Sequence, residues 1–451
     1  MTNQTIFITV SDTTVTRNII DTPLTANLIE RGVNVVLVCP EQRVAHYQER
    51  YAARGVAVVS FPQTPQSIVE RALSFAARNA FRSRTLRLMQ WRAFLSHESS
   101  VHPYIKYAFA YLFGHRLFRM VVRLCDRAQS SPPGLLELFD KYRPALVLST
   151  MLLDATIDVP MVREAKRQGV PVTGMVRSWD NLTTYGFIRV LPDRFIAQNN
   201  FIRDMAIHRH DVSAKRIEVI GLPHYDAYVA PSGIVSRVEF CATLGLDPYK
   251  PIWLYAAVGD FLFPAEATLT PILNELAEKF DAQVLFRAHP AHASETASFT
   301  HLKHITFDRT VAYLSDGFNA WEMRAEHESH FINTLHHSDI LITASGTSML
   351  VDGAVFDKPL ISVAFDGEKT MPYWFSIRRF FDHADHSKAL LDQGGTRIVN
   401  TKDELEEALA AYIHDPHLLA DGRRRIIDLL AAPVGGASER LAEALMRCVR
   451  R

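Results

Sequence analysis

The chain of 451 residues has few cysteines, no net charge and no long apolar run. The four cysteines (Cys39, Cys125, Cys241 and Cys448) form no CxxC pair, which argues against a disulfide framework or a cysteine zinc site and favours a reducing compartment. Lys plus Arg and Asp plus Glu number 49 each, so the zero net charge argues against nucleic acid as the main partner. No apolar run approaches the ~20 residues that span a bilayer, and the first residues lack the basic start of a signal peptide. We therefore expect a soluble, cytoplasmic protein.

Two sequence motifs are also missing. No GxGxxG follows the first expected strand, so the usual dinucleotide fingerprint is absent. No HExxH occurs, and the histidine pairs spaced i, i+3 (289 and 292, 301 and 304, 327 and 330) have no obvious third ligand nearby. We expect neither a bound metal nor a cofactor.

What the sequence does contain is a repeated alternation of strand and helix. Residues 5–10 and 33–38 are apolar strands, joined by an expected helix that runs from a polar turn at 11–17 to about Arg31 and stops at Gly32. This βαβ pattern predicts a parallel sheet, and it restarts in the second half of the chain, so we predict an α/β fold with a domain boundary near 225–235. Further strands are expected at 56–61, 145–150, 170–176, 194–198, 251–257, 283–287, 339–343 and 360–363.

Polar turns follow three of the strands expected in the second half. They contain Gly259, then Arg287 and His289, and then the small, hydroxyl-rich run Ser345, Gly346, Thr347 and Ser348. Ligands of open α/β sheets bind beyond the carboxyl ends of the strands, so these residues are candidates for holding a phosphate or diphosphate. The alternatives stay open: Ser345 and Ser348 also suit helix capping, and a single histidine is more often an ordinary surface or core residue.

The first half offers polar turns after Val10 and Val176, which we expect to face the second-half turns across a cleft between two domains. Asp180 is a candidate general base, being acidic and at a strand end, although an Asx turn or helix cap explains it equally well. Asp12, Arg17, Trp179 and Asn181 are candidate contacts for an acceptor substrate.

Residues 71–127 differ in composition from the rest of the chain. They carry eleven Lys or Arg against two acidic residues, Glu98 and Asp126, with aromatic residues interleaved. A basic, aromatic-rich helical insert suits contact with an anionic membrane surface or an anionic lipid-linked acceptor. The alternative is a solvated basic face over an ordinary core.

Several segments together resemble the GT-B superfamily of nucleotide-sugar transferases. The resemblance implies two Rossmann-like domains facing each other across a cleft: an acceptor domain at 1–228 with a basic helical insert at about 71–130, and a donor domain at 229–435. It also implies that a helix at 436–451 crosses back to the first domain. The resembling segments are GLPHYDAY (221–228), KPIWLYAAVGD (250–260), RAHP (287–290), SDILITASGTSMLVDGAVFDKPLISV (338–363) and GGASER (435–440).

Within that superfamily the likeness is to CDP-glycerol glycerophosphotransferases and to bacterial capsule transferases that use CMP-sugars. In the latter a histidine and paired serines hold the donor phosphate, which implies that role for His289, Ser345 and Ser348. The chain departs from the glycerophosphotransferase pattern at 343–348, where an Asp-Tyr-Ser-Ser turn is usual, and at 178–181, where a catalytic histidine is usual.

The function expected from these observations is metal-independent transfer of a sugar or polyol phosphate in polysaccharide biosynthesis at the cell envelope. The donor would be CMP-, CDP- or UDP-linked, and the acceptor a bacterial cell-surface glycan or a lipid-linked glycan. Peripheral contact with the inner face of the membrane would occur through 71–127. Two alternatives stay open: an enzyme similar to UDP-N-acetylglucosamine 2-epimerase, and a catalytically silent scaffold of a glycan assembly complex.

Overall fold

The computed structural model describes residues 4–63, 65–229, 233–290, 292, 294, 296–308, 312–313 and 321–449. The chain divides into two compact units, which are described separately here. Unit 1 comprises Met1–Gln90, His97–Asp226 and Ala432–Arg451, and unit 2 comprises Trp91–Ser96 and Ala227–Ala431.

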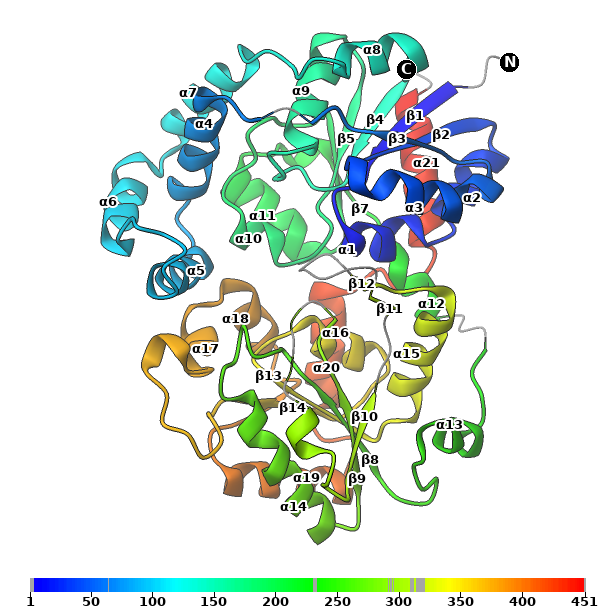
Figure 1. The fold of residues 1–451 in the computed structure, drawn as a ribbon, viewed down its shortest axis with the longest axis vertical. Helices are drawn as coiled ribbons and strands as arrows, with labels where there is room; N and C mark the ends of the chain where they lie inside the picture. The colour runs from blue at the N-terminus through cyan, green and yellow to red at the C-terminus, as the bar shows by residue number, and fades with distance from the viewer. Residues whose placement is uncertain are drawn as a thin grey trace. The chain divides into compact units, whose positions relative to one another are not determined.

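Unit 1 is built on a parallel sheet with the strand order β3-β2-β1-β4-β5-β6-β7 (Figure 1). Strands β1 to β6 coincide with runs expected from the sequence, because a strand covered on both faces is apolar at nearly every position. Strand β7, at the edge of the sheet, is not among the expected strands and exposes Glu218. The ladders between neighbours are all parallel. The strands are β1 (Gln4–Thr9), β2 (Val33–Cys39), β3 (Ala57–Ser60), β4 (Leu146–Ser149), β5 (Val172–Gly174), β6 (Arg194–Ala197) and β7 (Ile217–Val219).

The helix expected from the first polar turn to Arg31 is wrong as a single element. The chain forms α1 (Thr13–Val15), then a π-helical segment η1 (Thr16–Ile20), and resumes as α2 (Leu24–Glu30) after Pro23. Proline has no N–H to donate to the preceding turn, so a continuous helix is interrupted there. The other helices around this sheet are α3 (Glu41–Tyr51), α8 (Leu135–Tyr142), α9 (Asp158–Arg167), α10 (Asn181–Thr184), α11 (Asn200–His210) and α21 (Ala437–Val449), with short 3-10 turns η2 (Ala52–Arg54), η3 (Ala214–Arg216) and η4 (Pro223–Tyr225).

The basic, aromatic-rich segment is helical, as expected. It forms a group of helices at one side of the sheet (Figure 1) with its own small apolar core, which includes Leu73, Phe81 and Val122. These helices are α4 (Ile68–Asn79), α5 (Arg84–Leu95), α6 (Pro103–Phe113) and α7 (Arg116–Arg127).

The C-terminal helix α21 belongs to unit 1 and contributes Leu441 and Leu445 to its core. Its N-terminus is capped by Asp226, whose carboxylate accepts the backbone N–H groups of Ala437 (2.7 Å) and Ser438 (2.8 Å). Arg440 donates from Nε to the carbonyl of Ile220 at 2.8 Å. These hydrogen bonds therefore hold together the GLPHYDAY and GGASER segments, which are far apart in the sequence.

Unit 2 contains a second parallel sheet, of order β10-β9-β8-β13-β14-β15, and a short antiparallel pair, β11 with β12. The sequence analysis missed β10 and β15, which lie at the two edges and are short and only partly buried. The strands are β8 (Ile252–Ala256), β9 (Gln283–Arg287), β10 (Ile305–Asp308), β11 (Ala312–Tyr313), β12 (Trp321–Glu322), β13 (Ile340–Ala344), β14 (Leu360–Val363) and β15 (Arg397–Val399).

Helices pack against this second sheet around a core that includes Trp253, Phe286 and Ile342. No helix among the described residues is both long and apolar enough to cross a membrane. The helices are α12 (Asp226–Val229), α13 (Arg237–Leu244), α14 (Leu269–Lys279), α15 (Ala325–His337), α16 (Ser348–Val355), α17 (Arg378–His383), α18 (Asp385–Leu391), α19 (Lys402–His414) and α20 (Ala420–Leu430), with 3-10 turns η5 (Glu266–Thr268), η6 (Ala297–Phe299) and η7 (Tyr373–Phe375).

Candidate functional site

The register of the unit 2 sheet brings the three polar turns together at the carboxyl ends of its strands. Ala256 of β8 is paired with Arg287 of β9 on one side and with Thr343 of β13 on the other. Because all three strands are parallel, the segments that follow these residues leave the sheet at the same edge. Gly259, His289 and the 345–348 turn therefore begin from adjacent strands.

The turn between β13 and α16 has a constrained backbone. Ser345 has φ +66°, a left-handed conformation that is uncommon for a residue with a side chain and is often found at functional sites. A Cβ at Gly346 would lie 2.7 Å from Cα of Ser387, so only glycine fits there. The Ser387 hydroxyl donates to the Gly346 carbonyl at 3.0 Å, and the Ser362 hydroxyl donates to the Ser345 carbonyl at 2.8 Å. The turn is held from both sides.

The hydroxyl groups of this turn do not cap the helix that follows. The N-cap position of α16 is occupied by Thr347, whose side chain makes no capping hydrogen bond. Ser348, the first helical residue, is exposed, and its hydroxyl makes no hydrogen bond to any described residue. The first backbone N–H groups of α16 thus lack a side-chain acceptor, and such groups, with the positive end of the helix dipole, favour an anion.

His289 is a neutral hydrogen-bond donor in this structure. Burial, with a smaller contribution from His292, lowers the pKa of His289 to about 3, so the imidazole is uncharged near neutral pH. Its Nδ1 accepts the backbone N–H of His292 at 3.1 Å, which assigns the ring proton to Nε2. The rings of His289 and His292 are stacked with centroids 4.6 Å apart, which fixes the imidazole orientation.

Two other predicted donor-binding residues have polar groups engaged within the protein. The N–H of Gly259 donates to Glu266 at 2.7 Å, and that of Val258 donates to the other oxygen of the same carboxylate at 2.7 Å. Arg287 is buried and forms an ion pair with Asp308 at 2.9 Å. The sequence analysis missed Glu266, which lies seven residues beyond the turn it binds.

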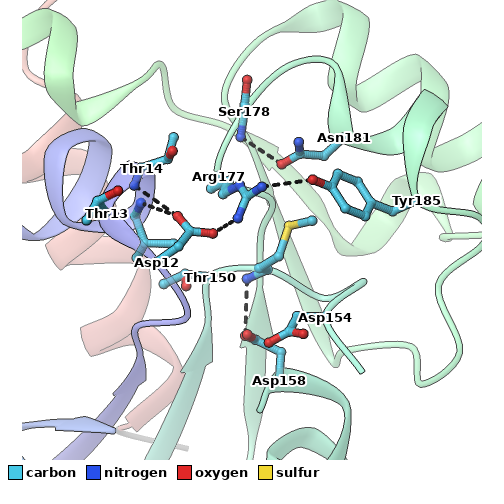
Figure 2. A network of polar contacts seen from close by, with 12 residues as sticks. Asp12, Thr13, Thr14, Thr150, Asp154, Asp158, Arg177, Ser178, Asn181 and Tyr185 are labelled. Carbon is cyan, nitrogen blue, oxygen red and sulfur yellow. Dashed lines mark hydrogen bonds and ion pairs between the residues drawn. The ribbon is translucent and has the colours of Figure 1, made fainter. Parts of the chain in front are cut away.

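In unit 1 the turns after β1 and β5 are joined by an ion pair between Asp12 and Arg177 (Figure 2). One carboxylate oxygen of Asp12 also accepts the backbone N–H groups of Thr14 (2.9 Å) and Val15 (3.2 Å), capping α1. Arg177 donates in addition to the hydroxyl of Tyr185 at 2.9 Å. Both oxygens of Asp12 thus have protein partners, and Arg177, which the sequence analysis did not select, is central to this edge of the sheet.

Asp180 stands at the N-cap of α10, yet its side chain makes no capping bond. One of its oxygens accepts Nδ2 of Asn181 at 3.2 Å, and the other makes no hydrogen bond within the described chain. Asn181 is itself buried and accepts the backbone N–H of Ser178 at 3.0 Å (Figure 2). Trp179 is buried with its ring 6.1 Å from that of Phe201. Of these three residues, Asp180 keeps the most open hydrogen-bonding capacity.

Arg17, also predicted as an acceptor contact, lies in the π-helical segment η1. Its guanidinium is 2.8 Å from Nε2 of His224, a buried residue of the GLPHYDAY segment. The neighbouring Asn18 donates to the carbonyl of Arg177 at 2.8 Å. π-helical segments are often found at functional sites, and here the segment connects the turn after β1 with those after β5 and β7.

A fully buried carboxyl group, Asp158, lies beneath this edge (Figure 2). Its Oδ1 accepts from Thr9 (2.5 Å), Ser149 (2.7 Å) and the backbone N–H of Met151 (3.1 Å), whereas its Oδ2 has no hydrogen-bond partner among the described residues. Burial, with a contribution from Asp154, raises the pKa of Asp158. The sequence analysis did not select this residue, because its burial depends on the packing of β1 against β4.

Among the residues that the structure describes, no group of three or more His, Cys, Asp or Glu is placed to hold a metal ion. A cavity of about 850 Å³ in unit 1 is lined by Arg194, the first residue of β6, and by Arg216, which directly precedes β7, and therefore lies at the opposite end of the strands from Asp12 and Arg177. None of the predicted site residues lines it.

Comparisons with models of known protein families and with curated proteins yield no match. Solved structures do match over the whole chain. The UDP-GlcNAc 2-epimerase of Neisseria meningitidis bound to UDP-GlcNAc has a TM-score of 0.58 at 10% identity, covering 98% of this chain and 100% of its own. A glycosyltransferase from Rickettsia africae has a TM-score of 0.52 at 11% identity and covers 100% of both chains. The calicheamicin glycosyltransferase CalG4 has a TM-score of 0.52 at 11% identity, covering 100% of this chain and 99% of its own.

These neighbours differ in reaction but share an architecture of two parallel α/β sheets. This chain likewise has two parallel α/β sheets, one in each of two Rossmann-like units. Identities near 10% establish the fold alone. The protein has the GT-B fold, the architecture of glycosyltransferases and UDP-GlcNAc 2-epimerases.

Proposed function

We propose that this protein is a glycosyltransferase that moves a sugar, or a polyol phosphate, from a nucleotide-activated donor to a bacterial cell-surface glycan or lipid-linked acceptor. The observation that carries the proposal is the register of unit 2, in which Ala256, Arg287 and Thr343 form one row across three parallel strands. The turns that follow this row supply hydrogen-bond donors of the kind a phosphate requires.

The donor phosphate binds, in this proposal, at the N-terminus of α16. Ser345 and Gly346 hold the backbone of the turn, while Thr347 and Ser348 offer hydroxyl and N–H donors. His289 adds an uncharged Nε2–H. Fixed donors of this kind stabilise the charge that develops on a departing nucleotide phosphate, so the reaction needs no bound metal. Gly259 and Arg287 act by supporting the turns, because their polar groups are already engaged.

Asp180 is the proposed general base, which takes the proton of the acceptor hydroxyl. It is half-buried, and one carboxylate oxygen is not used by the protein within the described residues. Arg17, Trp179 and Asn181 are proposed to shape the acceptor site around it, and Asp12 to fix Arg177. Three of the matched structures contain UDP or UDP-GlcNAc, so a UDP-linked donor is proposed ahead of CMP- and CDP-linked ones.

The donor assignment is tested by thermal-shift binding against CMP, CDP, UDP, GDP and their common sugar conjugates. A nucleotide that binds the folded protein raises the melting temperature. We expect the rise to be lost in His289→Ala and reduced in Ser348→Ala, whose exposed hydroxyl has no structural partner in the described chain. His301→Ala, an exposed histidine of the same unit, is the matched control. A full shift in both site variants would overturn the assignment, and no shift with any nucleotide would favour a catalytically silent scaffold.

A second candidate function is sugar epimerisation, which needs acidic residues around the sugar and no acceptor. The carboxyl groups of Asp12, Asp154, Asp158 and Asp180 all lie near the carboxyl-end edge of the unit 1 sheet (Figure 2 labels the first three), and several matched structures are UDP-GlcNAc 2-epimerases. The test is incubation with UDP-GlcNAc alone. An isomerised UDP-sugar that forms without any acceptor supports the epimerase. If UDP-GlcNAc stays unchanged alone and is consumed only after an acceptor is added, the result supports the transferase.

The proposed enzyme acts at the inner face of the membrane, in the cytoplasm, because a lipid-linked acceptor is held there. Peripheral contact through 71–127 follows from this location.

A further inference from the structure

Helix α7 is amphipathic, but its apolar face is exposed instead of being turned toward the core. Leu117, Met120, Val121 and Leu124 recur at the spacing of one helical face and are 66, 49, 48 and 60% exposed. An ordinary surface helix turns its apolar stripe toward the core and its charges toward water. In α7 the apolar stripe faces outward.

Three charged residues of α7, Arg119, Arg123 and Asp126, face inward, where each has a partner. Arg119 and Arg123 both bind Asp211, with nitrogen–oxygen distances of 2.8 Å. Asp126 is fully buried and forms ion pairs with Arg163 and Arg189. Turning the helix over would break all of these pairs and leave buried charges without partners. The outward direction of the apolar stripe is therefore fixed by the fold.

Helix α6, joined to α7 by a tight turn at Gly114, extends the exposed apolar surface. Tyr104, Ile105, Tyr111 and Leu112 are 61 to 75% exposed and also recur on one helical face. The rings of Phe113 and Phe118, one on each helix, lie 4.9 Å apart, so the two helices are neighbours (Figure 1). We call the following residues the α6–α7 apolar face: Tyr104, Ile105, Tyr111, Leu112, Leu117, Met120, Val121 and Leu124.

Arginines surround this face. Arg82 lies over the ring of Tyr111 at 5.5 Å, and Arg87 lies over that of Tyr107 at 5.1 Å. Both arginines are exposed, as are Arg116 and Arg127 at the two ends of α7. Between residues 71 and 127 the only exposed acidic residue is Glu98, since Asp126 is buried. Arg116 also lies 3.8 Å from a carboxylate oxygen of Asp211. The surface therefore combines exposed apolar side chains with several exposed arginines.

We propose that α6 and α7 are the surface through which this protein lies on a membrane that contains anionic lipids. The apolar face enters the boundary between headgroups and acyl chains, and the surrounding arginines bind lipid phosphates, which matches the two signals that stable peripheral binding requires. The inference deepens the proposed function, because a lipid-linked acceptor is found at such a surface. Its test needs neither donor nor catalysis, so it can fail independently of the transferase assignment.

The test is sedimentation with vesicles of phosphatidylcholine, with and without about one third phosphatidylglycerol. We expect the full chain to bind the anionic vesicles at least tenfold more tightly than the neutral ones, and less tightly as salt increases. Leu117→Gln combined with Leu124→Gln should reduce binding at least tenfold without changing the melting temperature, because both side chains are exposed. Val238→Gln, which changes a residue 58% exposed on α13 of unit 2, is the matched control.

Cys125 supplies a second readout, because it is exposed on α7 beside Leu124, whereas Cys39 and Cys241 are buried. With Cys448→Ser, an environment-sensitive fluorophore on Cys125 should shift to the blue when anionic vesicles are added. The proposal is overturned if the chain binds neither vesicle, or if the double variant binds as well as the original chain. It is also overturned if the apolar face proves to hold a second copy of the chain, seen as a dimer in light scattering that the double variant dissociates.

Discussion

Three aspartates near one edge of the unit 1 sheet have different surroundings, and these surroundings divide their roles. The carboxylate of Asp12 forms an ion pair with Arg177 and accepts two backbone N–H groups. Asp158 is fully buried, burial raises its pKa, and its Oδ1 accepts hydrogen bonds from Thr9 of β1 and Ser149 of β4, which links the two strands. Asp180 alone combines partial exposure with an oxygen unused by the described chain. Different surroundings give chemically identical carboxyl groups different pKa values, and in this way proteins assign them acid, base or structural roles.

Asp180→Asn is therefore expected to lower the rate of transfer by at least about 100-fold, the usual contribution of a general base. Nucleotide binding should be unchanged, because the proposed donor site is in unit 2. The measurement compares turnover with the nucleotide-induced melting shift, and Asp204→Asn, which alters a half-exposed side chain on α11, is the control. Unchanged turnover would remove Asp180 from the role of base.

Glu266 should make stability depend on pH. Burial raises its pKa to about 7 from 4.5, the value expected in the unfolded chain. Since the folded-state pKa is the higher one, folding takes up a proton between these values, and the associated stability is complete below pH 4.5 and is lost as the pH rises through 7. Relative to Glu266→Gln, the original chain should lose on the order of 1 to 3 kcal/mol between pH 4.5 and 8. Parallel pH profiles of the two proteins in chemical denaturation would contradict this.

At the scale of elements, the strand–turn–helix from β13 to α16 depends on two unusual backbone positions. Ser345 is left-handed, and Gly346 is pressed against Ser387. Neither feature is a matter of helix or strand propensity. Both keep the turn in one shape, and that shape presents the N-terminus of α16.

Substitutions at these two positions should change stability in opposite directions. Gly346→Ala places a methyl group within contact of Ser387 and should cost about 1 to 3 kcal/mol through overpacking. Ser345→Gly removes the left-handed penalty and should stabilise by up to about 1 kcal/mol. Denaturant unfolding of the two variants measures both effects. A Gly346→Ala protein as stable as the original would show that the turn relaxes freely.

Two arginines of the basic insert, Arg119 and Arg123 of α7, face inward and are not part of a solvated face, whereas Arg116 and Arg127 of the same helix are exposed. In the sequence, Arg119 and Arg123 are indistinguishable from the other basic residues of 71–127. In the structure they share Asp211, and hydrogen bonds from both guanidinium groups lower the pKa of that carboxyl to about 2 against the cost of burial. Charge counts alone do not distinguish a buried arginine from a solvated one.

At the scale of the whole molecule, the chain ends in the unit in which it began. Ala432–Arg451 belongs to unit 1, and Asp226 anchors it by capping α21. Gly221 lies so close that a Cβ there would be 2.2 Å from the carbonyl oxygen of Pro433. Two of the segments that resemble GT-B transferases thus meet at a structural joint.

Asp226→Ala should destabilise unit 1 by about 1 to 2 kcal/mol, the cost of losing a helix N-cap. Hydrogen exchange should rise in α21 and in the α2 helix against which it packs, while exchange in the unit 2 sheet stays unchanged. Asp421→Ala, whose carboxylate is 81% exposed, is the control. Equal protection of α21 in both variants would show that its apolar face alone holds it.

The sequence by itself determined the parallel α/β class and the positions of most buried strands, because a strand covered on both faces must be apolar along its length. It also located the turns at 257–260, 288–290 and 344–348, since polar residues directly follow those strands. Only the tertiary structure decided which polar groups remain available to a ligand. Glu266 accepts the backbone N–H groups of Val258 and Gly259, Asp308 forms an ion pair with Arg287, and Asp211 binds Arg119 on the inward side of α7. Most of these partners are distant in the chain, and even Glu266 reaches its turn only through packing. The local sequence pattern therefore does not predict which residues pair.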